Sequence, residues 1–73
     1  MKYVITFASV HFVMKAERVL KENGIEVRLI PTPRKISSDC GMTIEVKKED
    51  LDTIKELLKN REYRLENIHE LPS

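Results

Sequence analysis

Strand-type and helix-type hydrophobic patterns alternate along this chain, and their order constrains the fold more than any other feature of the sequence. Residues 3–8, YVITFA, are mostly β-branched or aromatic, as is typical of a strand. Apolar and polar residues alternate over 25–30, IEVRLI, and over 42–46, MTIEV, which also predicts strands. In all, we expect strands at 3–8, 25–30, 42–46 and 63–68, and helices at about 10–23 and 49–60.

The residues that flank these segments have the chemistry of helix and strand ends. Ser9 stands where the N-cap of the first helix belongs, and Gly24 follows its last turn as the expected C′ residue. Pro31 is expected to end the second strand, because proline has no N–H to donate. Glu49 and Asp50 favour the start of the second helix through the helix dipole.

The resulting order, β-α-β-β-α-β, predicts an α+β fold of the ferredoxin-like type, a four-stranded antiparallel sheet with two helices on one face. The right-handed crossover rule favours the spatial strand order 4-1-3-2. At 73 residues the chain is long enough for one domain with a small core. We expect this domain to span residues 1–70, with 71–73 as a frayed tail, and fraying to begin within the terminal segment 69–73, HELPS.

The composition argues against several classes of function. The 13 basic and 12 acidic residues leave a net charge of +1, so no nucleic acid and no anionic membrane is expected as a partner. No apolar run approaches the roughly 20 residues of a membrane span, and we interpret the apolar start as a strand, not a signal peptide. A single cysteine forms no internal disulfide, which fits a cytoplasmic location. One cysteine and two distant histidines are too few ligands for a zinc site, so no metal is expected.

The only cysteine, Cys40, lies in the loop PTPRKISSDCG at 31–41, between the second and third strands. In the predicted topology this loop is at the end of the sheet where the first helix begins. We therefore expect the thiol to lie near Ser9, Val10 and His11. A helix N-terminus carries free N–H groups and about half a positive charge, which lowers the pKa of a nearby thiol and makes its thiolate available.

Other residues of the loop are candidates for tuning or presenting this thiol, namely Pro31, Pro33, Arg34, Lys35, Ser37, Ser38 and Gly41. Arg34 and Lys35 add positive potential, and Asp39 opposes them. The two prolines stiffen the loop, and Gly41 permits a positive φ or a close approach to the first strand. The simpler alternatives stay open: solvated charges, serines that serve a turn, and an inert surface thiol.

The segments YVITFAS, AERVLKENGIEVRLIPTPR and ISSDCG together resemble the small selenium/sulfur carrier protein-like family over nearly the whole chain. The resemblance implies a cytoplasmic prokaryotic carrier whose cysteine holds sulfur as a persulfide or selenium as a selenosulfide. By motif, Cys40 would be the carrier residue and Gly41 its companion. Pro31, Pro33 and Arg34 would shape the loop.

Two hypotheses of function follow. In the first, a donor such as a cysteine desulfurase passes sulfur to Cys40 and an acceptor thiolate removes it, without a cofactor and without turnover by this protein alone. In the second, the chain is a non-enzymatic ferredoxin-like module whose loop binds a ligand or partner, with Ser37, Ser38 and Gly41 holding an anion. Both sides of the first strand are fairly apolar, so the sheet face away from the helices would carry an apolar stripe suited to a homodimer.

Overall fold

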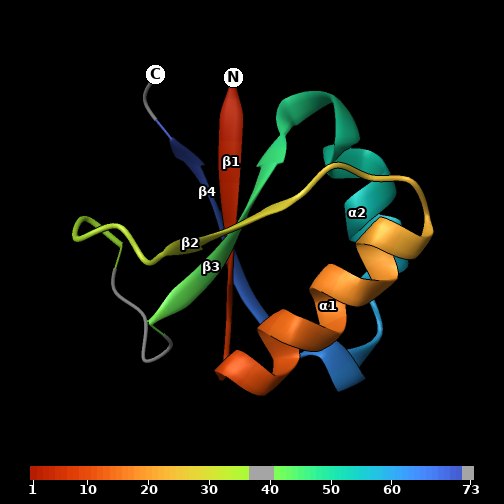
Figure 1. The fold of residues 1–73 in the computed structure, drawn as a ribbon, viewed down its shortest axis with the longest axis horizontal. Coiled ribbons are helices and arrows are strands. Elements are labelled where there is room, and N and C mark those ends of the chain that lie inside the picture. Colours follow the sequence, from red (N-terminus) through yellow and green to blue (C-terminus); the bar gives the residue numbers. More distant parts are fainter. Residues whose placement is uncertain (37–40, 72–73) are drawn as a thin grey trace.

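The computed structural model describes residues 1–36 and 41–71 and shows four strands and two helices (Figure 1). The elements are β1 (Lys2–Phe7), α1 (Val10–Glu22), β2 (Arg28–Pro31), β3 (Met42–Lys47), α2 (Leu51–Leu57) and β4 (Leu65–Leu71), with 3₁₀ turns η1 (Lys48–Asp50) and η2 (Arg61–Tyr63). No helix in the described ranges is both long enough and apolar enough to cross a membrane.

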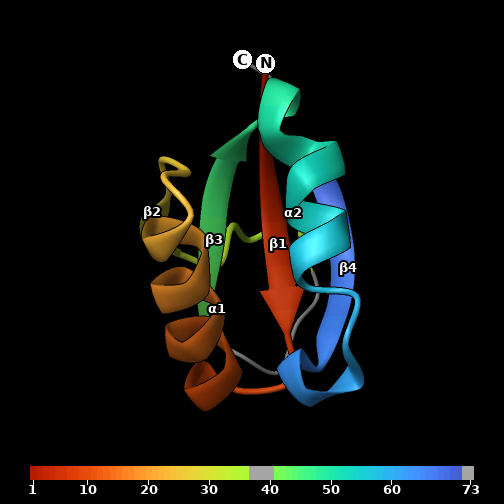
Figure 2. The ribbon, with the colours of Figure 1, turned by 90° about the vertical axis from the view of Figure 1, so that its right-hand side faces the viewer.

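The strands form one antiparallel sheet in the order β2-β3-β1-β4, with Ile5 of β1 opposite Ile44 of β3 and Ile68 of β4. This is the predicted order 4-1-3-2 read from the other edge. Both helices cover the same face of the sheet (Figure 2). The predicted α+β, ferredoxin-like architecture is therefore confirmed.

Several element boundaries differ from the predicted ones. The strand expected at 25–30 is β2 at Arg28–Pro31, since Ile25 N–H still bonds to Leu20 O (3.0 Å) at the end of α1. Pro31 is the last residue of β2, opposite Met42, and does not follow the strand as expected. It is tolerated there because β2 is an edge strand, in which a missing N–H need not break the sheet. The helix expected at about 49–60 is the shorter α2, preceded by η1.

The end of the chain departs most from prediction. The strand expected at 63–68 begins at Leu65, because Tyr63 belongs to η2 and packs into the core. It then continues to Leu71, where the sequence predicted fraying. Residues 69–71 pair with β1, for example Leu71 with Lys2, and this pairing keeps them in the sheet. Residues 72 and 73 lie outside the described residues.

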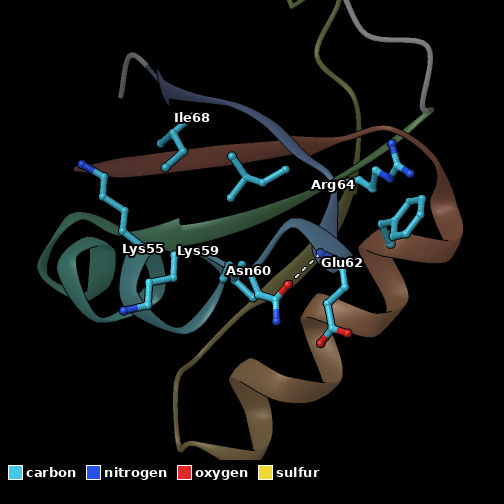
Figure 3. Close-up of a pocket in the computed structure, with 9 residues that line it drawn as sticks. Lys55, Lys59, Asn60, Glu62, Arg64 and Ile68 are labelled. Atoms are coloured by element: carbon cyan, nitrogen blue, oxygen red, sulfur yellow. Dashed lines mark hydrogen bonds between the residues drawn. The ribbon is translucent and has the colours of Figure 1, made fainter.

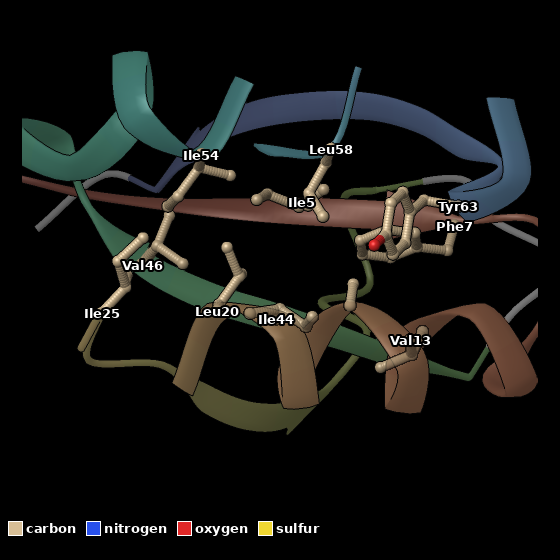
Figure 4. Close-up of a cluster of buried hydrophobic side chains, with 11 residues drawn as sticks. Ile5, Phe7, Val13, Leu20, Ile25, Ile44, Val46, Ile54, Leu58 and Tyr63 are labelled. Carbon is tan, nitrogen blue, oxygen red and sulfur yellow. The ribbon is translucent and has the colours of Figure 1, made fainter. Parts of the chain in front are cut away.

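The core lies between the sheet and the two helices (Figure 4). Its fully buried large side chains include Ile5 and Phe7 of β1, Leu20 of α1 and Ile54 of α2. Gly24 follows α1 with a φ of +75°, the left-handed conformation predicted for its C′ residue. The core is thus built mainly from β1, β3 and the two helices, whereas Val10, which the helical pattern included, is exposed.

The sheet face away from the helices has no exposed apolar stripe on β1, so this prediction was wrong. Val4, Thr6 and Thr43 alternate with the core residues, yet their relative exposures are 0%, 1% and 0%. The segment 32–36 turns back on this side of the sheet, opposite the helices, in both views (Figures 1 and 2). Even Nε2 of His69, a residue that pairs with Val4, is buried there, and it has no hydrogen-bond partner among the described residues. The centre of this face, on β1 and at the start of β3, is therefore buried, whereas Lys2, Arg28 and Asn67 on the same face are exposed.

Candidate functional site

The centre of the predicted site, Ser37, Ser38, Asp39 and Cys40, lies outside the described residues. The structure does describe both ends of the loop that carries them. One end leaves β2 at Pro31, and the other enters β3 through Gly41.

The two ends of the loop are joined by a backbone hydrogen bond. Thr32 N–H donates to Gly41 O at 3.0 Å, one step beyond the paired residues Pro31 and Met42. Next to this bond, Ile36 N–H donates to Pro33 O at 3.0 Å and closes a tight turn. The residue that follows Cys40 in the sequence is therefore fixed to the end of the sheet.

Gly41 meets neither of the two needs that the sequence suggested for a glycine. A Cβ added at this position would find no atom of the described residues within 4 Å, and the residue has no positive φ, unlike Gly24. Close approach to β1 is therefore not the reason for a glycine here. Gly41 is exposed, so the space beside it is open to solvent or to another molecule.

Ser9, Val10 and His11 form the start of α1. The Ser9 backbone is extended (φ −158°, ψ 168°), and its carbonyl accepts from Phe12 N–H at 3.1 Å, but its side chain makes no cap hydrogen bond. Val10 and His11 are both exposed. Ser9 is therefore the N-cap residue as predicted, but its carbonyl, not its hydroxyl, accepts from the first turn.

This helix start and Gly41 are at the same end of the sheet, as the predicted topology requires. β1 ends at Phe7, two residues before Ser9, and the antiparallel β3 begins at Met42. The exposed cations of the loop are placed differently. Arg34 and Lys35 belong to the segment 32–36, which lies on the face opposite α1 (Figures 1 and 2). The structure therefore does not bring them together with His11.

One cation at this end of the molecule has no counterpart among the predicted site residues. Arg64 joins η2 to β4 with a φ of +49°, and its carbonyl accepts from Ala8 N–H at 3.1 Å. Its side chain lines a groove that also includes Lys55, Lys59 and Ile68 (Figure 3). The one sequence signal nearby is Asn60, whose side-chain oxygen accepts from Glu62 N–H (3.0 Å), a turn that asparagine favours.

No group of three or more His, Cys, Asp or Glu side chains gathers closely enough to hold a metal ion among residues 1–36 and 41–71.

The chain belongs to the family described as "Putative Se/S carrier protein-like", which matches residues 2–70. This match spans the 31–41 loop together with both helices and all four strands up to Glu70. No curated protein and no solved structure matches the chain. The resemblance drawn from the sequence is confirmed, and the family name points to carriage of selenium or sulfur and to partners that give and take it.

Proposed function

We propose that this protein carries a single sulfur or selenium atom on Cys40 and passes it from a donor protein to an acceptor. The observation that carries the proposal is the family match over residues 2–70, because it includes the loop with the only thiol in the chain. The cytoplasm is the proposed location, since its reducing environment keeps a lone cysteine free.

The transfer is a thiol–persulfide exchange that needs no oxidant. The Cys40 thiolate attacks the outer sulfur of a donor persulfide, the S–S bond of the donor breaks, and its cysteine leaves as a thiolate. The new S–S bond on Cys40 stores the sulfur. An acceptor thiolate then attacks that outer sulfur, and Cys40 leaves as a thiolate in turn. A cysteine desulfurase-like enzyme is the class of donor that this chemistry requires.

The described surroundings support the proposal in part. The first-turn N–H groups of α1 lie at the end of the sheet where Gly41 enters β3, so the positive end of the helix dipole favours an anion there. His11 and Arg64 are exposed cation-forming side chains close to the same helix start. Arg34 and Lys35, on the opposite face, are better suited to meeting a partner than to stabilising a thiolate.

Intact mass spectrometry tests the proposal. The wild-type protein, incubated with cysteine and a desulfurase, is expected to gain the mass of one sulfur atom, and dithiothreitol is expected to remove it. Cys40→Ser should gain nothing, and selenocysteine in place of cysteine as the substrate of the desulfurase distinguishes selenium from sulfur carriage. An adduct that persists in Cys40→Ser, or no adduct on the wild type, would contradict the proposal.

A second candidate, a non-enzymatic interaction module, is favoured by the cationic groove that Arg64 lines. In that case Cys40→Ser would retain partner binding and lower its affinity only slightly. The homodimer that the sequence suggested would then need a surface other than the shielded side of β1.

A further inference from the structure

The groove lies on the helix side of the sheet, between the end of α2, the turn η2 and β4 (Figure 3). Its floor is apolar. Leu58 is a core residue, and the half-buried side chains of Phe12, Leu65 and Ile68 pack against the same core. An occupant that covers this floor with apolar side chains would remove further apolar surface from water, which favours binding.

The rim of the groove is cationic. Lys55, Lys59 and Arg64 are exposed along it, whereas Glu62 is the one carboxylate among the described lining residues. Glu62 is itself paired with Lys15, its Oε2 lying 3.5 Å from the Lys15 Nζ. Lys59 is likewise paired, its Nζ lying 2.7 Å from Glu56 Oε1, so the local excess of positive charge rests on Lys55 and Arg64. A rim of this kind complements an acidic surface.

The wall formed by η2 is held in place from three sides. Asn60 accepts from Glu62 N–H at 3.0 Å, and Lys15 of α1 lies 5.2 Å from the centroid of the Tyr63 ring. Ala8 N–H donates to the carbonyl of Arg64 at 3.1 Å. A wall fixed in this way requires little ordering when an occupant binds, which reduces the entropic cost of association.

The groove leads to the end of the sheet at which the cysteine loop rejoins β3. Figure 3 shows Lys55 and Ile68 at one end of the groove and Arg64 at the other, beside the start of α1. Leu65 is opposite Phe7, the last residue of β1, and β3 begins on the other side of β1. Neighbouring strands lie about 4.8 Å apart, so the Arg64 end is about 10 Å from the start of β3, across two strand spacings.

From this arrangement we infer that the groove is the docking surface for the sulfur donor protein, which meets it with an acidic surface that also bears apolar side chains. The inference rests on the proposed function and adds the surface and the chemistry of the partner. The groove is open along its length, whereas sites for small molecules enclose most of their ligand. A protein surface therefore fits it better than a small carboxylate.

The test compares two routes of loading Cys40 in the same variants. In one route a cysteine desulfurase at subsaturating concentration supplies the sulfur, and in the other inorganic polysulfide does. The variants are Lys55→Glu and Arg64→Glu in the groove and Arg18→Glu on α1, an exposed arginine that does not line the groove. Circular dichroism melts confirm that each variant is folded.

We expect both groove variants to lower the ratio of the desulfurase rate to the polysulfide rate by at least about fivefold at low salt, as reversed rim charges slow steered association. Arg18→Glu should leave the ratio unchanged. Salt of about 1 M, where the Debye length is about 3 Å, should remove most of the difference.

The remaining outcomes show whether the docking surface or the carrier function itself is wrong. An equal ratio in Lys55→Glu, Arg64→Glu and Arg18→Glu overturns the docking surface and leaves carriage by Cys40 intact. No adduct on the wild type by either route overturns the carrier function, and the docking inference falls with it.

Discussion

Thr6 is buried on the face of the sheet away from the helices, and its hydroxyl bonds twice to the backbone of β4. Its Oγ1 accepts from Asn67 N–H at 3.1 Å and donates to Asn67 O at 3.3 Å, where the register of β1 and β4 shifts. Thr6→Val keeps the shape but leaves these two backbone groups without their partner. We expect the free energy of unfolding to fall by about 1–3 kcal/mol, measured by urea denaturation.

Thr43 is the matched control because it is equally buried on the same face. Within the part of the chain that the structure describes, its hydroxyl makes one long contact, 3.5 Å to Ile30 O, which a valine can lose at little cost. Thr43→Val should change the free energy of unfolding by less than about 1 kcal/mol. Equal losses in the two variants would show that burial of the hydroxyl, not its bonding to β4, sets the cost.

Replacing the two glycines of the chain by alanine, one at a time, is expected to have opposite effects on stability. At Gly24, with a φ of +75°, a Cβ is strained, and Gly24→Ala should destabilise the protein by about 1 kcal/mol or more. At Gly41 a Cβ meets no atom of residues 1–36 or 41–71 within 4 Å, so Gly41→Ala should be neutral or stabilising by about 0.4–1 kcal/mol. Thermal melts of both variants measure these two effects on stability. A strongly destabilised Gly41→Ala would show that the loop requires a residue without a side chain at this position in order to fold.

For single residues, the sequence predicted those conformations that have a local cause. Gly24 ends a helix, and its left-handed backbone follows from that position alone. Arg64 adopts a positive φ without being glycine or asparagine, because its carbonyl is bonded to Ala8, 56 positions earlier in the chain. No local pattern encodes such a contact. This is why the sequence did not identify Arg64 as a candidate, although it did single out the loop of Cys40.

Between elements, an ion pair links the segment before β2 to the end of β3. Glu26 Oε2 lies 3.0 Å from Lys47 Nζ, and this hydrogen bond and the charge of Lys47 lower the pKa of Glu26. The same pair raises the pKa of Lys47. A carboxylate with a lowered pKa adds stability above its unfolded-state pKa, and that stability is lost as the pH falls through the folded-state value. Both side chains are largely exposed, so the contribution is small.

A carbon-detected NMR titration of the Glu26 carboxyl measures this coupling directly. Lys47→Met is expected to raise the pKa of Glu26, though not fully to its usual value, because Lys2 and Arg28 also lower it. Lys48→Met removes an equal charge from the next position and should leave the Glu26 pKa nearly unchanged. A Glu26 titration that is indifferent to Lys47→Met would mean that the pair does not form in solution.

The order and pairing of the helices and strands were predictable from the sequence, but the residues at which they begin and end were not. Hydrophobic periodicity identified four strands and two helices, since each must bury one side. The short turn η2 has no periodicity of its own, and it exists because Tyr63 reaches the core while Asn60 closes the turn. β4 is longer than its pattern suggested because β1 supplies backbone partners as far as Leu71.

The whole molecule is expected to be a monomer. The sheet face proposed for pairing from the sequence has its central side chains buried within the chain itself. The large apolar side chains most exposed among the described residues, Met1, Val10 and Met14, are on the N-terminus and α1. Light scattering at high protein concentration should give the mass of one chain. The mass of two would point to a different surface, such as the free edge of β4.

The hydrogen bond between Thr32 and Gly41 bears on how partner proteins reach the thiol. Consecutive Cα atoms are about 3.8 Å apart, so on the proposed function the cargo is one residue from a point anchored in the sheet. A carrier residue on a long tether can reach partner proteins bound at separate sites, since reach grows with tether length. This protein has no such tether between its anchor and its thiol. On the proposed function, donor and acceptor would therefore bind at the same place, and the acceptor would bind only after the donor has dissociated.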